Sequence, residues 1–209
     1  MKNWRRSCKA AVRSFRESLG EGGSPFFPKD ICDTKRGACK VNSTDPVLVI
    51  QRMTKAEIPE IAPLAARFRV ALKSYRGISS VPNTEEGAGE LQEYLDAGFP
   101  VFTARKGDVF CGYLVCRVEE PCVWAESLYV LPEFRRQGIA GALFRKAEAL
   151  AASFGEDTVY NYVHPNNDGV IAFLKSRGYT VLNMIELRKR WAGEKLTAKL
   201  QVGAHEFDY

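Results

Sequence analysis

The sequence contains no apolar run close to the roughly 18 residues that a membrane-spanning helix requires. Its N-terminus also lacks the continuous apolar segment of a secretory signal. The chain has 209 residues, of which 45% are hydrophobic and 26% are charged. This composition is typical of a soluble globular protein with one well-filled core. We therefore expect a cytoplasmic protein without a membrane span.

Closely spaced metal ligands are also missing. The chain has only two histidines, His164 and His205, and no two cysteines form a C-x-x-C pair. A zinc site built on close ligand pairs is therefore not supported, and we predict no metal. We interpret the six cysteines as reduced and either structural or incidental: Cys8, Cys32, Cys39, Cys111, Cys116 and Cys122.

Outside the first 20 residues there is no net positive charge, because Lys and Arg are balanced by Asp and Glu. That segment holds six Lys and Arg against one Glu, which equals the whole net charge of +5. The main body therefore has no general nucleic-acid footprint. Five apolar residues of the same segment recur at helical spacing: Trp4, Cys8, Val12, Phe15 and Leu19. Such a basic amphipathic helix could dock on the protein itself, lie on a membrane surface, bind a partner or act as a targeting peptide.

A glycine- and proline-rich stretch follows this helix, and regular patterning begins near residue 46. We predict a basic N-terminal extension and linker over 1–45 and one domain over 46–209. The expected strands cover 47–53, 99–105, 109–118, 122–130, 158–163 and 179–189, with a further strand near 199–207. The expected helices cover 54–75, 90–98, 138–154 and 170–177, and 77–89 is expected to be a loop. This order predicts an α/β fold with helices on both faces of a mixed sheet.

The segment PEFRRQGIAGALF, residues 132–144, leads into the helix expected from Gly138. The N-terminus of a helix carries unpaired N–H groups and a partial positive charge, so it can bind an anion. Gly138 and Gly141 have no side chain to obstruct that approach. The segment is neither G-x-x-x-x-G-K-[ST] nor G-x-G-x-x-G. By itself it indicates an anion site only weakly.

The surrounding residues resemble the signature of GNAT-type N-acetyltransferases, a strand ending L-x-V-x-P-x-[FY] and then [RQ]-x-x-G-x-[GA]. Arg135, Gly138 and Ala140 fill the three fixed places of its second half. A second landmark of the family, N-x-x-[AV]-[IV]-x-[FL]-x-x-x-x-G-[YF], is matched by Asn167, Val170, Ile171, Phe173, Gly178 and Tyr179. The resemblance covers about residues 46–190. It implies the GNAT fold, a mixed and mostly antiparallel sheet flanked by helices on both faces.

The resemblance also implies acetyl-CoA as cosubstrate and assigns residues to it. Main-chain N–H groups would hold the pyrophosphate, at Arg136, Gln137, Gly138, Ile139, Ala140 and Gly141, next to Arg135. The backbone of Leu128, Tyr129 and Val130 would pair with the pantetheine arm, at a point where the strand over 158–163 splays away. Asn167 would contact the cofactor from the second landmark.

The implied reaction is acetyl transfer to a primary amine, which could be a protein α-amine, a lysine or a small amine. We choose Glu126 as the base, with a charge at an exposed edge or a structural ion pair as the alternative interpretation. His164 ranks below it. We expect the acceptor to bind opposite the cofactor, among the early helices and the loop Gly77 to Gly89.

The tyrosine that often serves as the general acid in the family is Leu174 in this chain. Tyr162 is our choice for that role, and the alternatives are Tyr129, water, or a thiolate that leaves without a proton. A further alternative is a non-catalytic acyl-CoA-binding sensor on the same scaffold. Acetyl-CoA and the amine acceptor are the expected partners, and a homodimer stays open.

Overall fold

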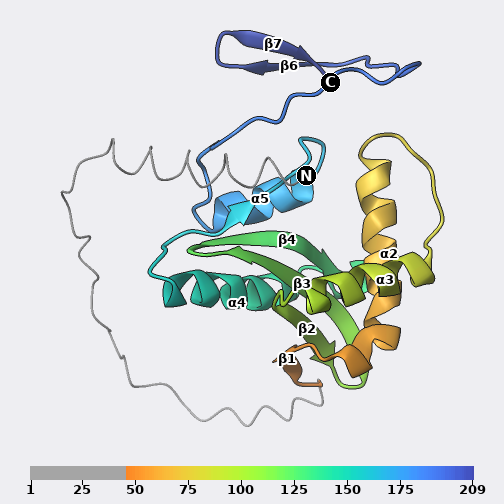
Figure 1. The fold of residues 1–209 in the computed structure, drawn as a ribbon, viewed down its shortest axis with the longest axis vertical. Helices are drawn as coiled ribbons and strands as arrows, with labels where there is room; N and C mark the ends of the chain where they lie inside the picture. Colours follow the sequence, from red (N-terminus) through yellow and green to blue (C-terminus); the bar gives the residue numbers. More distant parts are fainter. Residues whose placement is uncertain (1–45) are drawn as a thin grey trace, which may run out of the picture. The chain divides into compact units, whose positions relative to one another are not determined.

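The computed structural model describes residues 46–209, whose main element is one five-stranded sheet (Figure 1). The strands follow the order β1-β2-β3-β4-β5. The first four pair antiparallel, and β5 pairs parallel to β4. Their bounds are β1 (Leu48–Arg52), β2 (Val101–Lys106), β3 (Val109–Glu119), β4 (Cys122–Val130) and β5 (Tyr160–Asn161). The predicted mixed, mostly antiparallel sheet is confirmed, whereas the predicted N-terminal helix lies outside the described residues.

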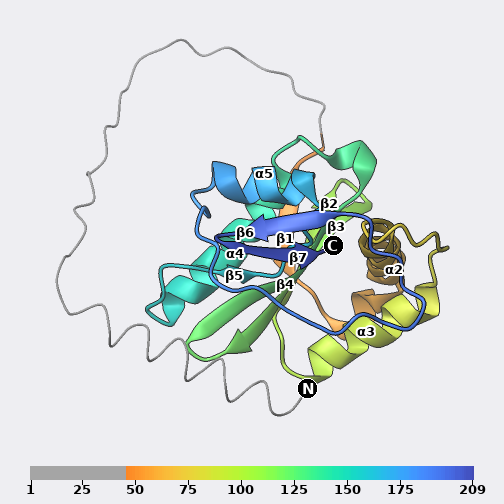
Figure 2. The same ribbon diagram turned by 90° about the horizontal axis from the view of Figure 1, so that it is seen from above.

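Helices cover both faces of this sheet, as predicted. Figures 1 and 2 show α2 and α3 on one side and α4 on the other. The α-helices are α2 (Ile58–Ser74), α3 (Thr84–Asp96), α4 (Ile139–Ser153) and α5 (Asp168–Ser176). Two short 3-10 helices, η1 (Lys55–Glu57) and η2 (Pro132–Phe134), precede α2 and α4.

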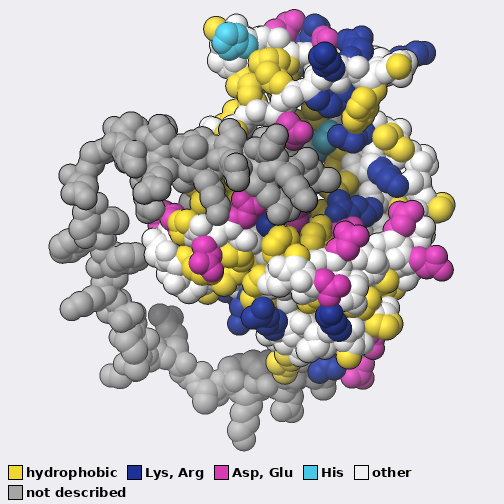
Figure 3. All heavy atoms as spheres, in the orientation of Figure 1, with side chains coloured by type: hydrophobic (Ala, Val, Ile, Leu, Met, Phe, Trp, Pro, Cys, Tyr) yellow, Lys and Arg dark blue, Asp and Glu magenta, His cyan; other side chains and the backbone are white. Residues whose placement is uncertain are grey.

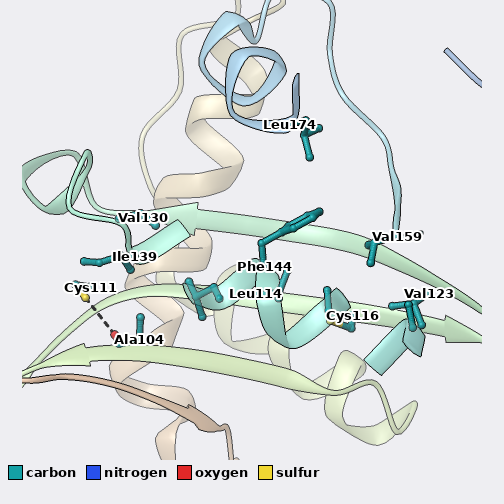
Figure 4. Packing of buried hydrophobic residues seen from close by; sticks show 13 residues of the cluster. Ala104, Cys111, Leu114, Cys116, Val123, Val130, Ile139, Phe144, Val159 and Leu174 are labelled. Carbon is teal, nitrogen blue, oxygen red and sulfur yellow. Dashed lines mark hydrogen bonds between the residues drawn. The ribbon is translucent and has the colours of Figure 1, made fainter. Parts of the chain in front are cut away.

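Strand β3 supplies side chains to two separate cores. Because side chains alternate along a strand, Tyr113 and Val115 pack toward α2 and α3. Leu114 and Cys116 pack toward α4, in the cluster shown in Figure 4. A strand that is buried on both faces must be apolar throughout its centre, which explains the run of small and aliphatic residues in β3.

The helix starts follow from side-chain caps. The predicted capping box is present, since the Thr54 N–H donates to Glu57 Oε2 at 2.7 Å. Helix α3 begins at Thr84, inside the expected loop 77–89, so that prediction is wrong for its second half. The reason is Asn83, whose Oδ1 accepts from the N–H groups of Glu85 and Glu86 at 3.1 and 3.2 Å.

The C-terminal part differs most from the prediction. Strand β5 is two residues long, and 179–189 form no strand in the described part of the chain. A strand needs a paired edge as well as local preference. Residues 179–189 have the alternating pattern but no partner strand in the described part of the chain, so they form no strand. Residues 199–208 form a separate hairpin of β6 (Lys199–Val202) and β7 (His205–Asp208) where one strand was expected.

Three cysteines lie in the described residues: Cys111 and Cys116 are buried free thiols, and Cys122 is half-buried at the start of β4. The buried Cys111 donates from Sγ to the Ala104 carbonyl at 3.3 Å (Figure 4). Burial raises the pKa of Cys116 to about 12, so its thiol stays protonated near neutral pH. No helix over 46–209 is long and apolar enough to cross a membrane.

The close approach of α2 and α3 depends on Gly87. A Cβ atom at this position would lie 2.5 Å from the Ala62 carbonyl oxygen. We expect Gly87→Val to reduce the free energy of unfolding by about 1–3 kcal/mol, because the two helices must separate. Urea denaturation measures this change. Gly89→Ala is the matched control, since nothing lies within 4 Å of its added carbon. An equal loss in both variants would contradict the packing argument.

Candidate active site

The sheet opens where β4 and β5 diverge. These strands pair only at Trp124–Tyr160 and Ala125–Asn161. On its other edge, β4 has a bulge, because Ser127 pairs with Val115 and Ala125 pairs with Cys116, which leaves Glu126 between them. Residues 127–130 therefore have β3 on one side and, within residues 46–209, no strand on the other. The expected splay at a bulge is present.

Glu126 is the bulge residue itself. Its carboxylate accepts a hydrogen bond from Arg117 Nε at 3.0 Å, and its side chain is 30% exposed. The ion pair that stood as the alternative interpretation is thus present. It lies at the mouth of the opening, so Glu126 is both paired and accessible.

The candidate proton donors differ in accessibility. The Tyr162 ring stacks on Trp124, with centroids 4.7 Å apart and planes 10° apart, and Tyr162 is 48% exposed. Tyr129 is buried against Phe68. Leu174 is buried in the core beside α4 (Figure 4), so the position that often carries a tyrosine only contributes to packing.

His164 is held by contacts away from the opening. Its ring stacks on Tyr75 at 5.8 Å, and its Nδ1 lies 2.8 Å from the Tyr209 hydroxyl. Burial and the charge of Arg76 lower the pKa of His164, so the neutral ring is favoured. These contacts account for the position of the His164 ring without a chemical step.

The loop from Arg135 to Gly138 has two residues in the left-handed region, Arg136 at φ 62° and Gly138 at φ 79°. Only glycine adopts this conformation without strain, so Arg136 stores strain at the candidate site. In the first turn of α4, the Ala142 N–H donates to the Gly138 carbonyl at 3.0 Å. The N–H groups of residues 139–141 have no helical carbonyl four residues earlier to accept their hydrogen bonds. They are therefore available to an anion.

The side chains of this loop hold the loop itself. Arg135 Nε donates to the Val130 carbonyl at 3.0 Å, which ties the loop to the end of β4. Gln137 Nε2 donates to the Glu133 carbonyl at 3.2 Å, and Gln137 Oε1 accepts from Lys106 Nζ at 3.0 Å. The Arg135 and Gln137 side chains are therefore engaged in contacts within the protein.

Asn167 has a structural role that the sequence motif did not reveal. It is the N-cap of α5, where its Oδ1 accepts from the Val170 N–H at 3.2 Å. Sequence reasoning also missed Arg117, which lies opposite Trp124 in the β3–β4 register. The pairing of the two strands was needed to bring it beside Glu126. Among residues 46–209 no group of three or more His, Cys, Asp or Glu could hold a metal ion.

The family is decided by sequence comparison. Residues 68–179 match the model of the acetyltransferase (GNAT) family. This chain belongs to the GNAT family. An uncharacterized N-acetyltransferase of Mycobacterium tuberculosis is 30% identical over 135 residues, which cover 62% of this GNAT chain and 85% of that relative. A counterpart in Mycobacterium bovis gives the same figures.

Solved GNAT structures share the fold. Aminoglycoside N-acetyltransferase AAC(6')-Iy in complex with CoA has a TM-score of 0.55 and 20% identity, and the match covers 70% of this chain and 97% of that one. A ribosomal-protein-alanine N-acetyltransferase from Brucella melitensis has a TM-score of 0.55 and 16% identity, with 69% and 100% covered. The predicted GNAT fold and the predicted N-acetyltransferase enzyme are confirmed.

The cap at Asn167 predicts a stability effect without any ligand. We expect Asn167→Ala to reduce the free energy of unfolding by about 1 kcal/mol, because the Val170 N–H loses its acceptor. Asn167→Asp should retain most of the stability, since a carboxylate also caps a helix. Urea denaturation in the absence of CoA measures both. Equal losses in the two variants would show that the cap is not the stabilising contact.

Proposed function

We propose that this enzyme transfers the acetyl group of acetyl-CoA to a primary amine in the opening between β4 and β5. One observation carries the proposal. The pairing of β4 with β5 ends at Ala125, while its pairing with β3 continues to Val130. A few residues later the chain enters a loop and the N-terminus of α4, whose first main-chain N–H groups have no acceptor within the helix. A free strand edge fits the amide-bearing pantetheine arm, and a helix N-terminus fits the pyrophosphate.

The cofactor would then be held mainly by backbone groups. Leu128, Tyr129 and Val130 present the open edge of β4 to the pantetheine amides. The N–H groups from Arg136 to Gly141 surround the pyrophosphate, with Arg135 fixing the loop. Asn167 would approach from the start of α5, in addition to its role as a cap.

The chemistry needs a base, a binding site for the oxyanion and a proton for the leaving group. The amine nitrogen attacks the thioester carbonyl carbon while its proton passes to the Glu126 carboxylate. A main-chain N–H near Leu128 stabilises the oxyanion, an effect worth on the order of 3 kcal/mol. The C–S bond then breaks, and the thiolate takes a proton from the Tyr162 hydroxyl. The products are an acetamide and CoA.

The acceptor would enter on the side of α2 and α3, where acidic and basic side chains are interspersed (Figure 3). The choice among a protein α-amine, a lysine and a small amine stays open. One solved neighbour is named as an aminoglycoside N-acetyltransferase, and another is named as a ribosomal-protein-alanine N-acetyltransferase. Both classes therefore belong in the first panel of acceptors. A homodimer and a cytoplasmic location remain predictions.

Gly141 tests the cofactor site. Gly141→Asp places a carboxylate in the first turn of α4, where it favours the helix but repels a pyrophosphate. An added Cβ meets only Arg177 and Arg145 side chains, at 3.7 and 3.8 Å. We expect the Kd for acetyl-CoA to rise at least about tenfold with no loss of thermal stability, by calorimetry. Gly89→Asp, in α3, is the matched control and should bind normally. Normal binding by Gly141→Asp would reject this site.

Glu126 tests the reaction. Release of CoA thiol is measured with small amines, aminoglycosides, lysine peptides and peptides with a free α-amine. We expect turnover with at least one class, and a fall in kcat of about 100-fold or more for Glu126→Gln. Binding of acetyl-CoA should change little, because Glu126 faces the acceptor. Tight binding without turnover on any amine would favour the sensor instead. Unchanged kcat in Glu126→Gln would remove this residue as the base.

A further inference from the structure

Arg117 is a half-buried cation next to the opening, and the proposed reaction gives it no task. It lies on β3 opposite Trp124, and its side chain is only 15% exposed. The Nε atom donates to Glu126 Oε2 at 3.0 Å, and Nη1 donates to Glu119 Oε1 at 2.8 Å. One guanidinium thus connects the bulge of β4 to the end of β3.

The aromatic residues of the same site surround this guanidinium. Its carbon lies 5.1 Å from the Trp124 ring centroid and 5.9 Å from that of Tyr162. Burial opposes the charge of Arg117. The negative charges of Glu126 and Glu119 and a hydrogen bond with Tyr162 outweigh that cost, so its pKa is raised. Arg117 is therefore a permanent cation in contact with both groups to which a proton transfer is assigned.

Glu126 needs such a support because of where it lies. At the bulge the residue has no partner opposite it in the strand ladder. Its flexible side chain would otherwise be free to change rotamer. Arg117 engages Oε2, which leaves Oε1 as the oxygen to accept the amine proton. The planar guanidinium fixes the directions of its N–H groups, so Nε can donate to Glu126 while Nη1 donates to Glu119, which a lysine ammonium cannot do equally well.

We propose that Arg117 is a positioning residue that fixes the Glu126 carboxylate and the Tyr162 hydroxyl on either side of the reacting thioester. It touches neither substrate nor cofactor and acts through these two groups. The inference rests on the proposed function, since it requires Glu126 to act as the base. Glu119 binds the same guanidinium from the far end of β3 and has no part in the reaction.

The test uses the full chain and the best amine of the panel. We expect Arg117→Gln to lower kcat at least about tenfold while the KM for acetyl-CoA changes less than about twofold. Arg117→Lys should recover part of kcat, because it keeps the charge but loses the fork. Glu119→Gln is the matched control, since it also removes a carboxylate from Arg117, and it should stay within about threefold of the original kcat.

A double variant separates positioning from a general structural effect. In a Glu126→Gln background, Arg117→Gln should lower kcat much less than it does in the unmodified enzyme, because only the Tyr162 hydroxyl is then left to position. A fully additive loss would overturn the inference, and so would an unchanged kcat in Arg117→Gln while Glu126→Gln is slow. If Arg117→Gln does not fold, as judged by circular dichroism, the same cycle is run with Arg117→Lys. No turnover in the unmodified enzyme, or normal turnover in Glu126→Gln, overturns the proposed function and this inference together.

Discussion

The short parallel pairing of β4 with β5 is the constraint on which the rest of the site depends. Two paired positions bring the strands together at Trp124 and Ala125, and the bulge at Glu126 then turns β4 away. The free edge of β4 follows, and its end feeds the loop that Arg135 ties back to Val130. If the pairing continued, a strand would occupy the edge to which we assign the pantetheine arm. Cofactor binding and chemistry therefore share one geometric origin.

The elements around the candidate site could be predicted from sequence because their decisive signals are local. Gly138 starts α4, Asn167 starts α5, and the β4 strand precedes them at fixed spacing. These are properties of short segments, in which glycine conformation and capping act between near neighbours. The two core faces of β3 likewise follow from alternation alone.

The parts that could not be predicted are those set by tertiary pairing. The segment 179–189 has a strand pattern, yet Val181 and Leu182 are 87% and 69% exposed because no strand edge lies beside them. Arg117 is nine residues from Glu126, and the two meet only through the register of β3 and β4 with its bulge. The prediction also placed the start of α3 too late, and for a different reason. Asn83 gave a local signal for it, but the glycines that follow, at 87 and 89, suggested a loop instead.

In the proposed site, the loop before α4 would bind the pyrophosphate through its main chain, while Arg135 and Gln137 hold the conformation of the loop. A scan that truncates one side chain at a time would therefore leave every phosphate-binding N–H in place. Losses found at Arg135 or Gln137 would report on loop shape, while residues such as Ile139 and Ala140 would seem unimportant for the cofactor. A binding site mapped by such a scan would leave out the main-chain N–H groups that we assign to the pyrophosphate. Methods that alter the backbone itself, such as amide-to-ester replacement, are the ones that could detect them.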